Sequence, residues 1–222
     1  TVTPTADLAR TVAPCGFRFD DDLLYFLTPD DGDLVARRAP VADGAETEVV
    51  VSEGELSGLS VRDGRVAFTR SEWDHRGDVF SVDAPADGHA GDPTRLSEVN
   101  ADLLAERDVQ EPEEFRFESE GHEVQGWVLT PPDYDPEEEY PLAVEIHGGP
   151  HVMWSTSGTM FHEFQLLAAR GYVVFWCNPR GSTGYGEEHA MGIDRDWGDV
   201  TMADAVAGAD RVCAEYGVDE AN

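Results

Sequence analysis

Lysine is absent from this 222-residue chain, so its 15 basic residues are all arginine and stand against 46 acidic ones. The formal net charge of −31 argues against a nucleic-acid partner, because a phosphate backbone would be repelled. Such a charge also strains a compact fold unless molar salt shortens the Debye length to about 3 Å. Acidic residues are spread along the whole chain. We therefore expect a halophilic protein from a salt-rich cytoplasm rather than an ordinary acidic protein.

Cysteine and long apolar runs are scarce as well. Cys15, Cys177 and Cys213 are odd in number and far apart, which suits reduced thiols better than a disulfide frame or a zinc site. No apolar run approaches 18 residues, and no signal-peptide pattern opens the chain. We expect a cytoplasmic protein with no membrane partner, metal or cofactor. The first residue is not Met, so we also expect a fragment, and a homo-oligomer is compatible with the sequence.

Short β-like runs cut by Asp- and Gly-rich turns fill residues 23–84. The runs at residues 23–28 and 33–39 recur at 65–70 and 78–84, a period typical of four-stranded propeller blades. A β-sandwich with regular turns is the alternative. We predict the last blades of a β-propeller over residues 1–112. The domain boundary is expected where the β pattern stops, close to Pro112.

Residues 113–222 are expected to form part of an α/β domain. A hairpin of strands 114–119 and 123–130 is followed by two apolar runs, 142–146 and 172–177, on either side of a helix predicted over 159–170. This strand–helix–strand order predicts two parallel neighbours in one sheet.

A second helix is predicted over residues 200–216, with Asp199 as its N-cap. Helical spacing places an apolar stripe on one face, made of Met202, Val206, Ala209, Cys213 and Tyr216. The tail after Gly217 is expected to lead into a further strand.

Two Gly- and Pro-rich motifs follow the predicted parallel strands: HGGP at residues 147–150 and NPRGSTGYG at residues 178–186. Function in open α/β sheets gathers at these carboxyl ends of strands. Adjacent glycines leave main-chain N–H groups unshielded, and such groups can stabilise the anion that develops on a substrate carbonyl. Gly149, and with less support Gly148, is therefore an oxyanion-hole candidate. A turn that merely needs a positive φ is the alternative.

The order hairpin, strand, HGGP, helix, strand, NPRGSTGYG, long helix resembles the prolyl oligopeptidase family of serine peptidases, and most of all its acylaminoacyl peptidase and dipeptidyl peptidase branch. The resemblance implies a β-propeller joined to the N-terminal half of an α/β-hydrolase domain. It implies that the Gly149 N–H supplies one oxyanion donor. It also implies that the nucleophilic Ser, the Asp and the His lie beyond Asn222.

Other polar residues fit catalysis less well. Ser182 lies in RGSTG, where the first elbow position is Arg and no helix starts directly after the Ser, so a loop role is favoured over a nucleophile. Arg180 could hold a substrate carboxylate or clamp its loop through an acidic neighbour such as Glu187 or Asp199. His147 and His151 lie on a strand end and turn, which disfavours a metal pair. Trp197 and Asp199 are expected to serve packing and helix capping.

The sequence thus predicts a serine peptidase that, at full length, cleaves short or N-acylated peptides through an acyl-enzyme. The present chain, which lacks the triad, is expected to be inactive alone. Two alternatives stay open: a non-catalytic binding or scaffold module on the same fold, and a carboxylesterase.

Overall fold

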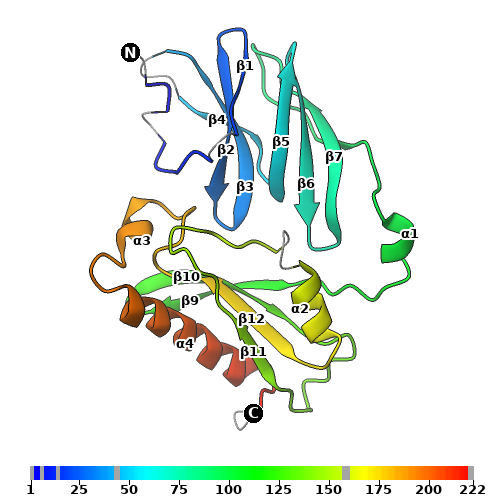
Figure 1. The fold of residues 1–222 in the computed structure, drawn as a ribbon, viewed down its shortest axis with the longest axis vertical. Helices are drawn as coiled ribbons and strands as arrows, with labels where there is room; N and C mark the ends of the chain where they lie inside the picture. Colours follow the sequence, from blue (N-terminus) through cyan, green and yellow to red (C-terminus); the bar gives the residue numbers. More distant parts are fainter. Residues whose placement is uncertain (1–2, 6–7, 14–15, 43–45, 157–160, 220–222) are drawn as a thin grey trace.

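The computed structural model describes residues 3–5, 8–13, 16–42, 46–156 and 161–219. These residues form two β-sheets that lie one above the other in Figure 1. The first sheet uses residues 18–95 and the second uses residues 113–178. A segment with the single-turn helix α1 (Ala101–Leu104) connects them. The predicted domain limits of 1–112 and 113–222 agree with this layout but stay a prediction.

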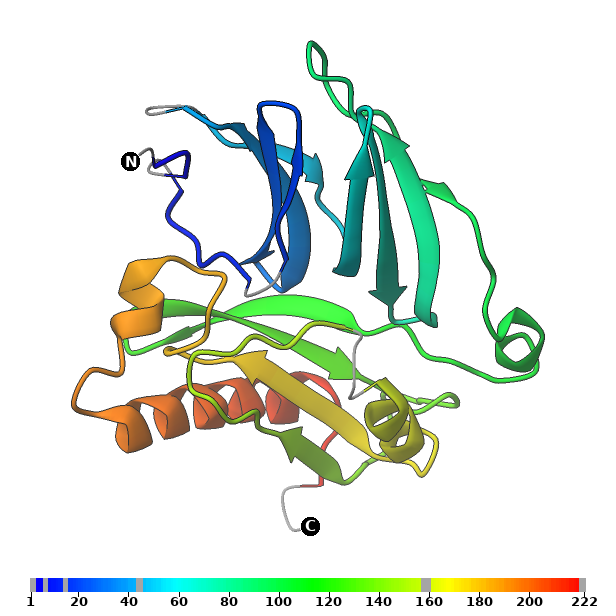
Figure 2. The ribbon, with the colours of Figure 1, turned by 45° about the horizontal axis from the view of Figure 1, so that its top comes forward.

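The first sheet consists of two antiparallel groups of strands. They meet at one parallel pair, Leu34 with Glu55, and Figure 2 shows the groups side by side. The first group contains β1 (Arg18–Asp20), β2 (Leu23–Asp30), β3 (Asp33–Pro40) and β4 (Glu48–Val51). The second contains β5 (Glu55–Arg62), β6 (Arg65–Glu72), β7 (His75–Asp83) and β8 (Thr94–Arg95).

Tight turns set the register of this sheet. Asp31-Gly32 and Asp63-Gly64 join their strands as two-residue loops with positive φ at both positions, the geometry in which Asp-Gly is favoured. Successive side chains of each strand point to opposite faces of the sheet, and the side chains on one face form a continuous core. Its largest members are the aromatic residues Tyr25, Phe68 and Phe80.

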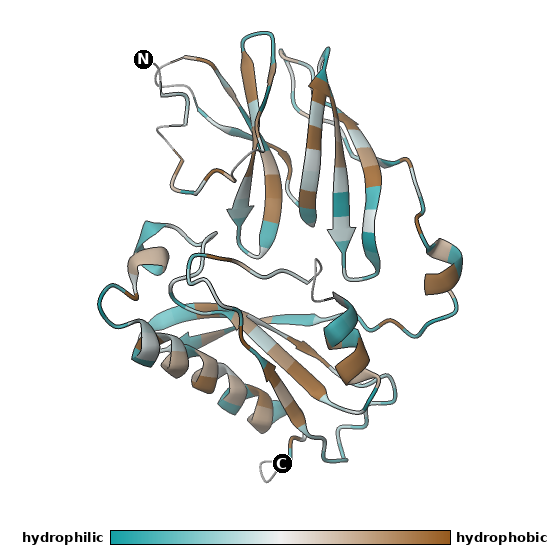
Figure 3. Cartoon of the chain, in the orientation of Figure 1, coloured by the Kyte–Doolittle hydropathy of each residue, from teal (hydrophilic) through white to brown (hydrophobic). Residues whose placement is uncertain are grey.

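The second sheet has the strand order β11-β12-β10-β9. β9 (Glu113–Ser119) and β10 (His122–Leu129) form the predicted hairpin around Glu120-Gly121. β11 (Leu142–Glu145) and β12 (Val173–Asn178) are parallel, as the strand–helix–strand pattern predicts. Both are among the most hydrophobic segments of this sheet (Figure 3).

Helices cover both faces of the second sheet. α4 (Trp197–Glu215) packs on the side of Phe117, Phe175 and Cys177, whereas α2 (Phe161–Ala168) packs on the side of Trp127 and Trp176. Alternate residues of β12 point to opposite faces, so every residue of this central strand is buried. Burial also raises the pKa of the Cys177 thiol to about 12, which keeps it protonated.

The prediction for α4 needs two corrections. The helix begins at Trp197 with Asp196 as N-cap, so Asp199 lies in its first turn, and Trp197 is 55% exposed instead of packed. The predicted apolar stripe faces the core only in part, because Met202 and Val206 are 60% and 52% exposed whereas Ala209 and Tyr216 pack against the core. The side that packs on the sheet carries small residues and one acid: Asp204, Ala205, Gly208 and Val212.

The α2 prediction was two residues too long at the C-terminal end, since the helix ends at Ala168. Phe164 and Ala168 are buried as expected, and Gly171 takes the positive φ of +88° after the helix. Thr159, Met160 and Cys15 lie outside the described residues. None of the helices in the described ranges combines the length and apolarity needed to cross a membrane.

The two sheets meet through the β2–β3 turn. The Asp31 N–H donates to the Gly184 carbonyl at 3.1 Å, and Gln125 Nε2 donates to the Asp31 carbonyl at 3.2 Å. A Cβ on Gly32 would come within 2.8 Å of the Trp127 ring, so this contact requires glycine. A second link joins Ser155 Oγ to Glu55 Oε2 at 3.0 Å.

Candidate active site

The HGGP loop, residues 147–152, begins where β11 ends. Gly149 has φ +146°, and a Cβ there would lie 2.3 Å from the Val152 side chain. A side chain at Gly148 would instead meet open space. Only the second glycine is therefore required by the packing of the loop, because its positive φ and the close approach of Val152 leave no room for a Cβ.

The NPR loop, residues 178–186, follows β12 at the neighbouring strand end. Asn178 is fully buried and anchors it, because its side chain accepts from Trp154 N–H at 2.8 Å and donates to the Trp154 carbonyl at 2.8 Å. Its amide also donates to the Tyr185 hydroxyl at 2.7 Å. Tyr185 in turn donates to Gln125 of β10. The NPR loop is thus fixed to the sheet from both ends.

Three polar contacts connect the HGGP loop to the NPR loop, and the two are called interlocked below. His147 Nε2 lies 3.2 Å from Ser182 Oγ, and His151 Nδ1 lies 2.9 Å from the Gly181 carbonyl. The Thr183 N–H donates to the Val152 carbonyl at 3.0 Å. Two motifs about 30 residues apart in the sequence therefore form one unit at the carboxyl ends of β11 and β12, where the sequence predicts a site.

Ser182 has the surroundings of a structural residue. Its side chain is 1% exposed, and Oγ donates to the Pro179 carbonyl at 2.7 Å. His147 Nδ1 faces the Gly148 carbonyl at 2.9 Å instead of a carboxylate, so the Ser182–His147 contact has no orienting acid. The geometry agrees with the loop role favoured from the sequence.

The Arg180 guanidinium contacts two acidic side chains. Its Nε and Nη2 contact the Asp204 carboxylate at 3.1 and 2.7 Å, and Nη2 also contacts Glu120 at 2.8 Å. The expected partners Glu187 and Asp199 were wrong. Hydrogen bonding to Asp204, against the effect of burial, raises the pKa of Arg180 above its usual value. A substrate-binding role for Arg180 stays a prediction, and its 6% exposure favours the structural alternative.

A cleft of about 500 Å³ opens beside the interlocked loops. One wall comes from residues 8–11, which precede the first sheet and, together with it, are called the first half of the molecule. They include Arg10, whose Nε donates to Asp30 Oδ1 at 2.7 Å. The other wall comes from His151, the end of the NPR loop and α3 (Glu187–Met191). A small polar substrate could enter here between the two halves of the molecule.

Sequence reasoning did not find Asp204, Glu120 or Gln125, the residues that hold the NPR loop. The first lies in the middle of α4 and the second in a hairpin turn, far from the motifs in the sequence. One local feature could have pointed to Asp204: it is an acidic residue within an otherwise small and apolar stretch of α4, and buried acidic residues are usually paired.

Residues 158–222 match the family model described as "Prolyl oligopeptidase family". Over 117 residues the chain is 41% identical to "Uncharacterized peptidase YuxL" of Bacillus subtilis; the match covers 52% of this chain and 18% of that protein. It is 40% identical over 85 residues to a probable dipeptidyl-peptidase 5 of Aspergillus niger, which covers 38% of this chain and 12% of that protein.

The fold is also similar to a solved structure. Pyrococcus horikoshii acylaminoacyl peptidase aligns with a TM-score of 0.81 at 24% identity, over 97% of this chain and 33% of that one. The chain therefore spans less than a fifth of these two curated relatives and a third of the solved structure. The family model, the curated relatives and the solved structure thus agree in what they resemble: the chain is similar to the prolyl oligopeptidase family over its C-terminal part and shares the fold of an acylaminoacyl peptidase over nearly its whole length.

Proposed function

We propose that this chain is part of a serine peptidase that cleaves short or N-acylated peptides through an acyl-enzyme, with the Gly149 N–H as one oxyanion donor. The observation that carries the proposal is the HGGP loop. It is locked against the NPR loop, is free of a side chain at Gly149 and lies at the carboxyl end of β11. Removing one such donor typically costs about 10²–10³ in kcat.

The rest of the catalytic machinery would come from sequence beyond these 222 residues, because the chain covers a small part of its curated relatives. Val218 already pairs in parallel with Tyr140, directly before β11. Beside that pair, β11 and α4 present an apolar groove lined by Val144, Ile146, Met202 and Val206. A further parallel strand would cover this groove and bring its own carboxyl end next to Gly149.

The first half would contribute propeller blades that limit access to small, unstructured substrates. Its two antiparallel groups of strands and the cleft between the two halves support this role. The charge balance and the free Cys177 thiol support a reducing, salt-rich cytoplasm as the place of action.

The first test is to read the gene beyond residue 222 in the same frame and assay the whole protein on an acyl-amino-acid anilide. A strand followed by G-x-S-x-G and measurable anilide cleavage are expected. An elbow without Ser would contradict the proposal and favour a binding module. Preference for a p-nitrophenyl ester, without anilide cleavage, would favour a carboxylesterase.

The role of Gly149 is tested in the same protein with a matched pair. Gly149→Ala pushes the loop away from Val152, so kcat is expected to fall about 10²–10³-fold with little change in KM. Gly148→Ala, where a side chain meets open space, should stay within a few-fold of wild type. Equal losses in both variants, with unchanged thermal stability, would remove Gly149 from the oxyanion hole.

The 222-residue chain itself is expected to show no peptidase activity. Turnover that Ser182→Ala abolishes would overturn this expectation and assign the chemistry to the Ser182–His147 contact.

A further inference from the structure

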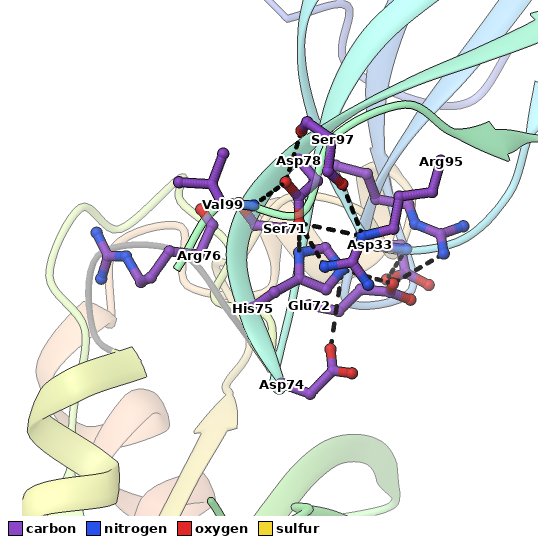
Figure 4. A network of polar contacts seen from close by, with 12 residues as sticks. Asp33, Ser71, Glu72, Asp74, His75, Arg76, Asp78, Arg95, Ser97 and Val99 are labelled. Carbon is purple, nitrogen blue, oxygen red and sulfur yellow. Dashed lines mark hydrogen bonds and ion pairs between the residues drawn. The ribbon is translucent and has the colours of Figure 1, made fainter. Parts of the chain in front are cut away.

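The turn between β6 and β7 gathers three side chains that can bind a metal ion. Glu72, Asp74 and His75 each offer one ligand atom, and these atoms lie within 4.8 Å of one another. Figure 4 shows the three side chains around the turn, with Asp74 and Asp78 on opposite sides of the imidazole. The cluster belongs to the first sheet and is separate from the HGGP and NPR loops.

His75 is the centre of the cluster. Its side chain is 3% exposed and stacks on Phe80, with ring centroids 6.1 Å apart. Nε2 lies 3.2 Å from Glu72 Oε2 and 3.8 Å from Asp74 Oδ1. Nδ1 is buried without a hydrogen-bond partner and faces Asp78 Oδ2 at 3.9 Å. A buried imidazole is thus aimed at two carboxylates, with a third carboxylate behind it.

The charges around His75 are not balanced by protein cations. Burial alone would raise the pKa of Asp78, but hydrogen bonds from Ser97, Val99 N–H and Arg95 outweigh it and lower the pKa to about 2. Arg70 contacts Glu72 Oε2 at 2.8 Å. Among the described residues, no arginine forms an ion pair with Asp74. Three carboxylates therefore share two arginines, which leaves an excess negative charge next to Nε2.

The spacing of the ligand atoms fits a small cation. Zinc binds nitrogen and oxygen ligands at about 2.0–2.2 Å, so neighbouring ligands of a tetrahedral ion lie about 3.3–3.6 Å apart. The distances of 3.2 and 3.8 Å from Nε2 lie on either side of this range. Asp78 Oδ2 lies 3.9 Å from Nδ1, on the side of the ring from which a carboxylate commonly orients a metal-bound histidine, although the two atoms are too far apart for a hydrogen bond.

We propose that Glu72, Asp74 and His75 bind one divalent transition-metal ion, with zinc as the representative ion, through His75 Nε2 and one oxygen of each carboxylate. The imidazole selects first-row transition metals over calcium and magnesium, which prefer oxygen ligands alone. Asp74 is half-exposed, so the ion is open to solvent on that side and a water molecule completes its shell. The ion replaces the missing positive charge and fixes the β6–β7 turn.

The test uses the chain freed of metal with a chelator and then dialysed against Zn²⁺ in molar KCl with excess Mg²⁺. We expect one tightly retained zinc per chain by elemental analysis, and an unfolding temperature that rises with the Zn²⁺ concentration. His75→Gln and Asp74→Asn should each weaken Zn²⁺ binding at least tenfold and abolish the thermal shift. Asp74→Asn is the safer variant for folding, because its side chain is half-exposed.

His89→Gln is the matched control. His89 lies between β7 and β8, with Nδ1 3.4 Å from Glu48 Oε1, but it is fully exposed and has no second carboxylate in that contact. The His89→Gln variant should bind zinc as tightly as the wild-type chain. Zinc that Mg²⁺ displaces, or zinc retention that is unchanged in both His75→Gln and Asp74→Asn, would overturn the proposal and assign binding to scattered surface carboxylates. Absence of zinc from a folded wild-type chain would overturn it as well.

Discussion

At the scale of single residues, the contact between Arg180 and Asp204 does most to hold the NPR loop in place. Asp204 is fully buried and accepts hydrogen bonds from the guanidinium and from the Arg180 main-chain N–H, the latter at 2.8 Å. Removing the arginine would leave a buried carboxylate with one remaining donor from this residue. Such uncompensated buried charges are among the most costly defects in a protein interior.

Arg180→Met is therefore expected to lower the free energy of unfolding by about 3–5 kcal/mol. Arg116→Met is the control, because Arg116 forms a half-exposed ion pair with Glu123 at 3.3 Å and should cost less than about 1 kcal/mol. Urea titrations of both variants in molar KCl measure the difference. Equal costs would mean that the buried pair contributes no more than a surface pair.

The sequence predicted where the two loops lie better than it predicted the partners of their residues. Gly149 and the interlocked motifs could be placed because glycine conformation and strand ends are local properties. The partner of Arg180 could not, because it depends on how α4 is rotated against the sheet. Asp204 is brought to Arg180 by packing over 24 positions of sequence.

At the scale of elements, α4 shows why an apolar stripe can mislead. Its larger apolar side chains, such as Met202 and Val206, lie on the exposed side, while Gly208 lies against the sheet. Phe117 and Phe175 project from the sheet and fill the space that side chains of the helix would otherwise occupy. Size complementarity, which a single sequence does not reveal, therefore decides the orientation of the helix.

Replacing a glycine of α4 by alanine is expected to have opposite effects on stability at two positions, Gly208 and Gly198. A Cβ on Gly208 would lie 2.2 Å from Phe175 and 2.7 Å from Phe117, so Gly208→Ala should cost about 1–3 kcal/mol despite the better helix propensity of alanine. A Cβ on Gly198 would have no heavy atom of another residue within 4 Å, so Gly198→Ala should stabilise the chain by up to about 1 kcal/mol. Thermal unfolding of the pair is the measurement. Stabilisation by both substitutions would contradict the packing of α4.

The existence and order of most strands followed from the sequence, since the Asp-Gly turns and the alternation of apolar residues are local signals. Helix ends did not, because no side chain makes a capping hydrogen bond at Asp196. The cluster at Glu72, Asp74 and His75 was also missed. Its residues are neighbours in sequence, but only the tight β6–β7 turn brings their ligand atoms together.

At the scale of the whole molecule, charge dominates the behaviour. The net charge of −31 is carried by a chain whose two halves meet through a few hydrogen bonds and the small β2–β3 turn. Repulsion between acidic surfaces acts over about 10 Å at 0.1 M salt but over about 3 Å at 1 M. Salt should therefore stabilise both the fold of each half and the contact between them.

The temperature of unfolding is expected to rise steadily from low salt to molar KCl. Replacing Glu137, Glu138 and Glu139, which are all exposed, by Gln removes three charges, from −31 to −28, and should reduce the slope. Differential scanning calorimetry over a KCl series measures both effects. A flat or falling trend in the wild-type chain would count against adaptation to high salt.

The contact between His147 and Ser182 also bears on how these positions vary among related chains. Ser182 Oγ contacts His147 Nε2 inside a buried space and also donates to the Pro179 carbonyl, so replacing the serine alone leaves the imidazole nitrogen without this partner. Natural substitutions at the two positions should therefore occur together. In an alignment of homologues, a chain that has lost the serine should also have lost the histidine, whereas exposed acidic positions such as Glu137 and Glu138 should drift independently.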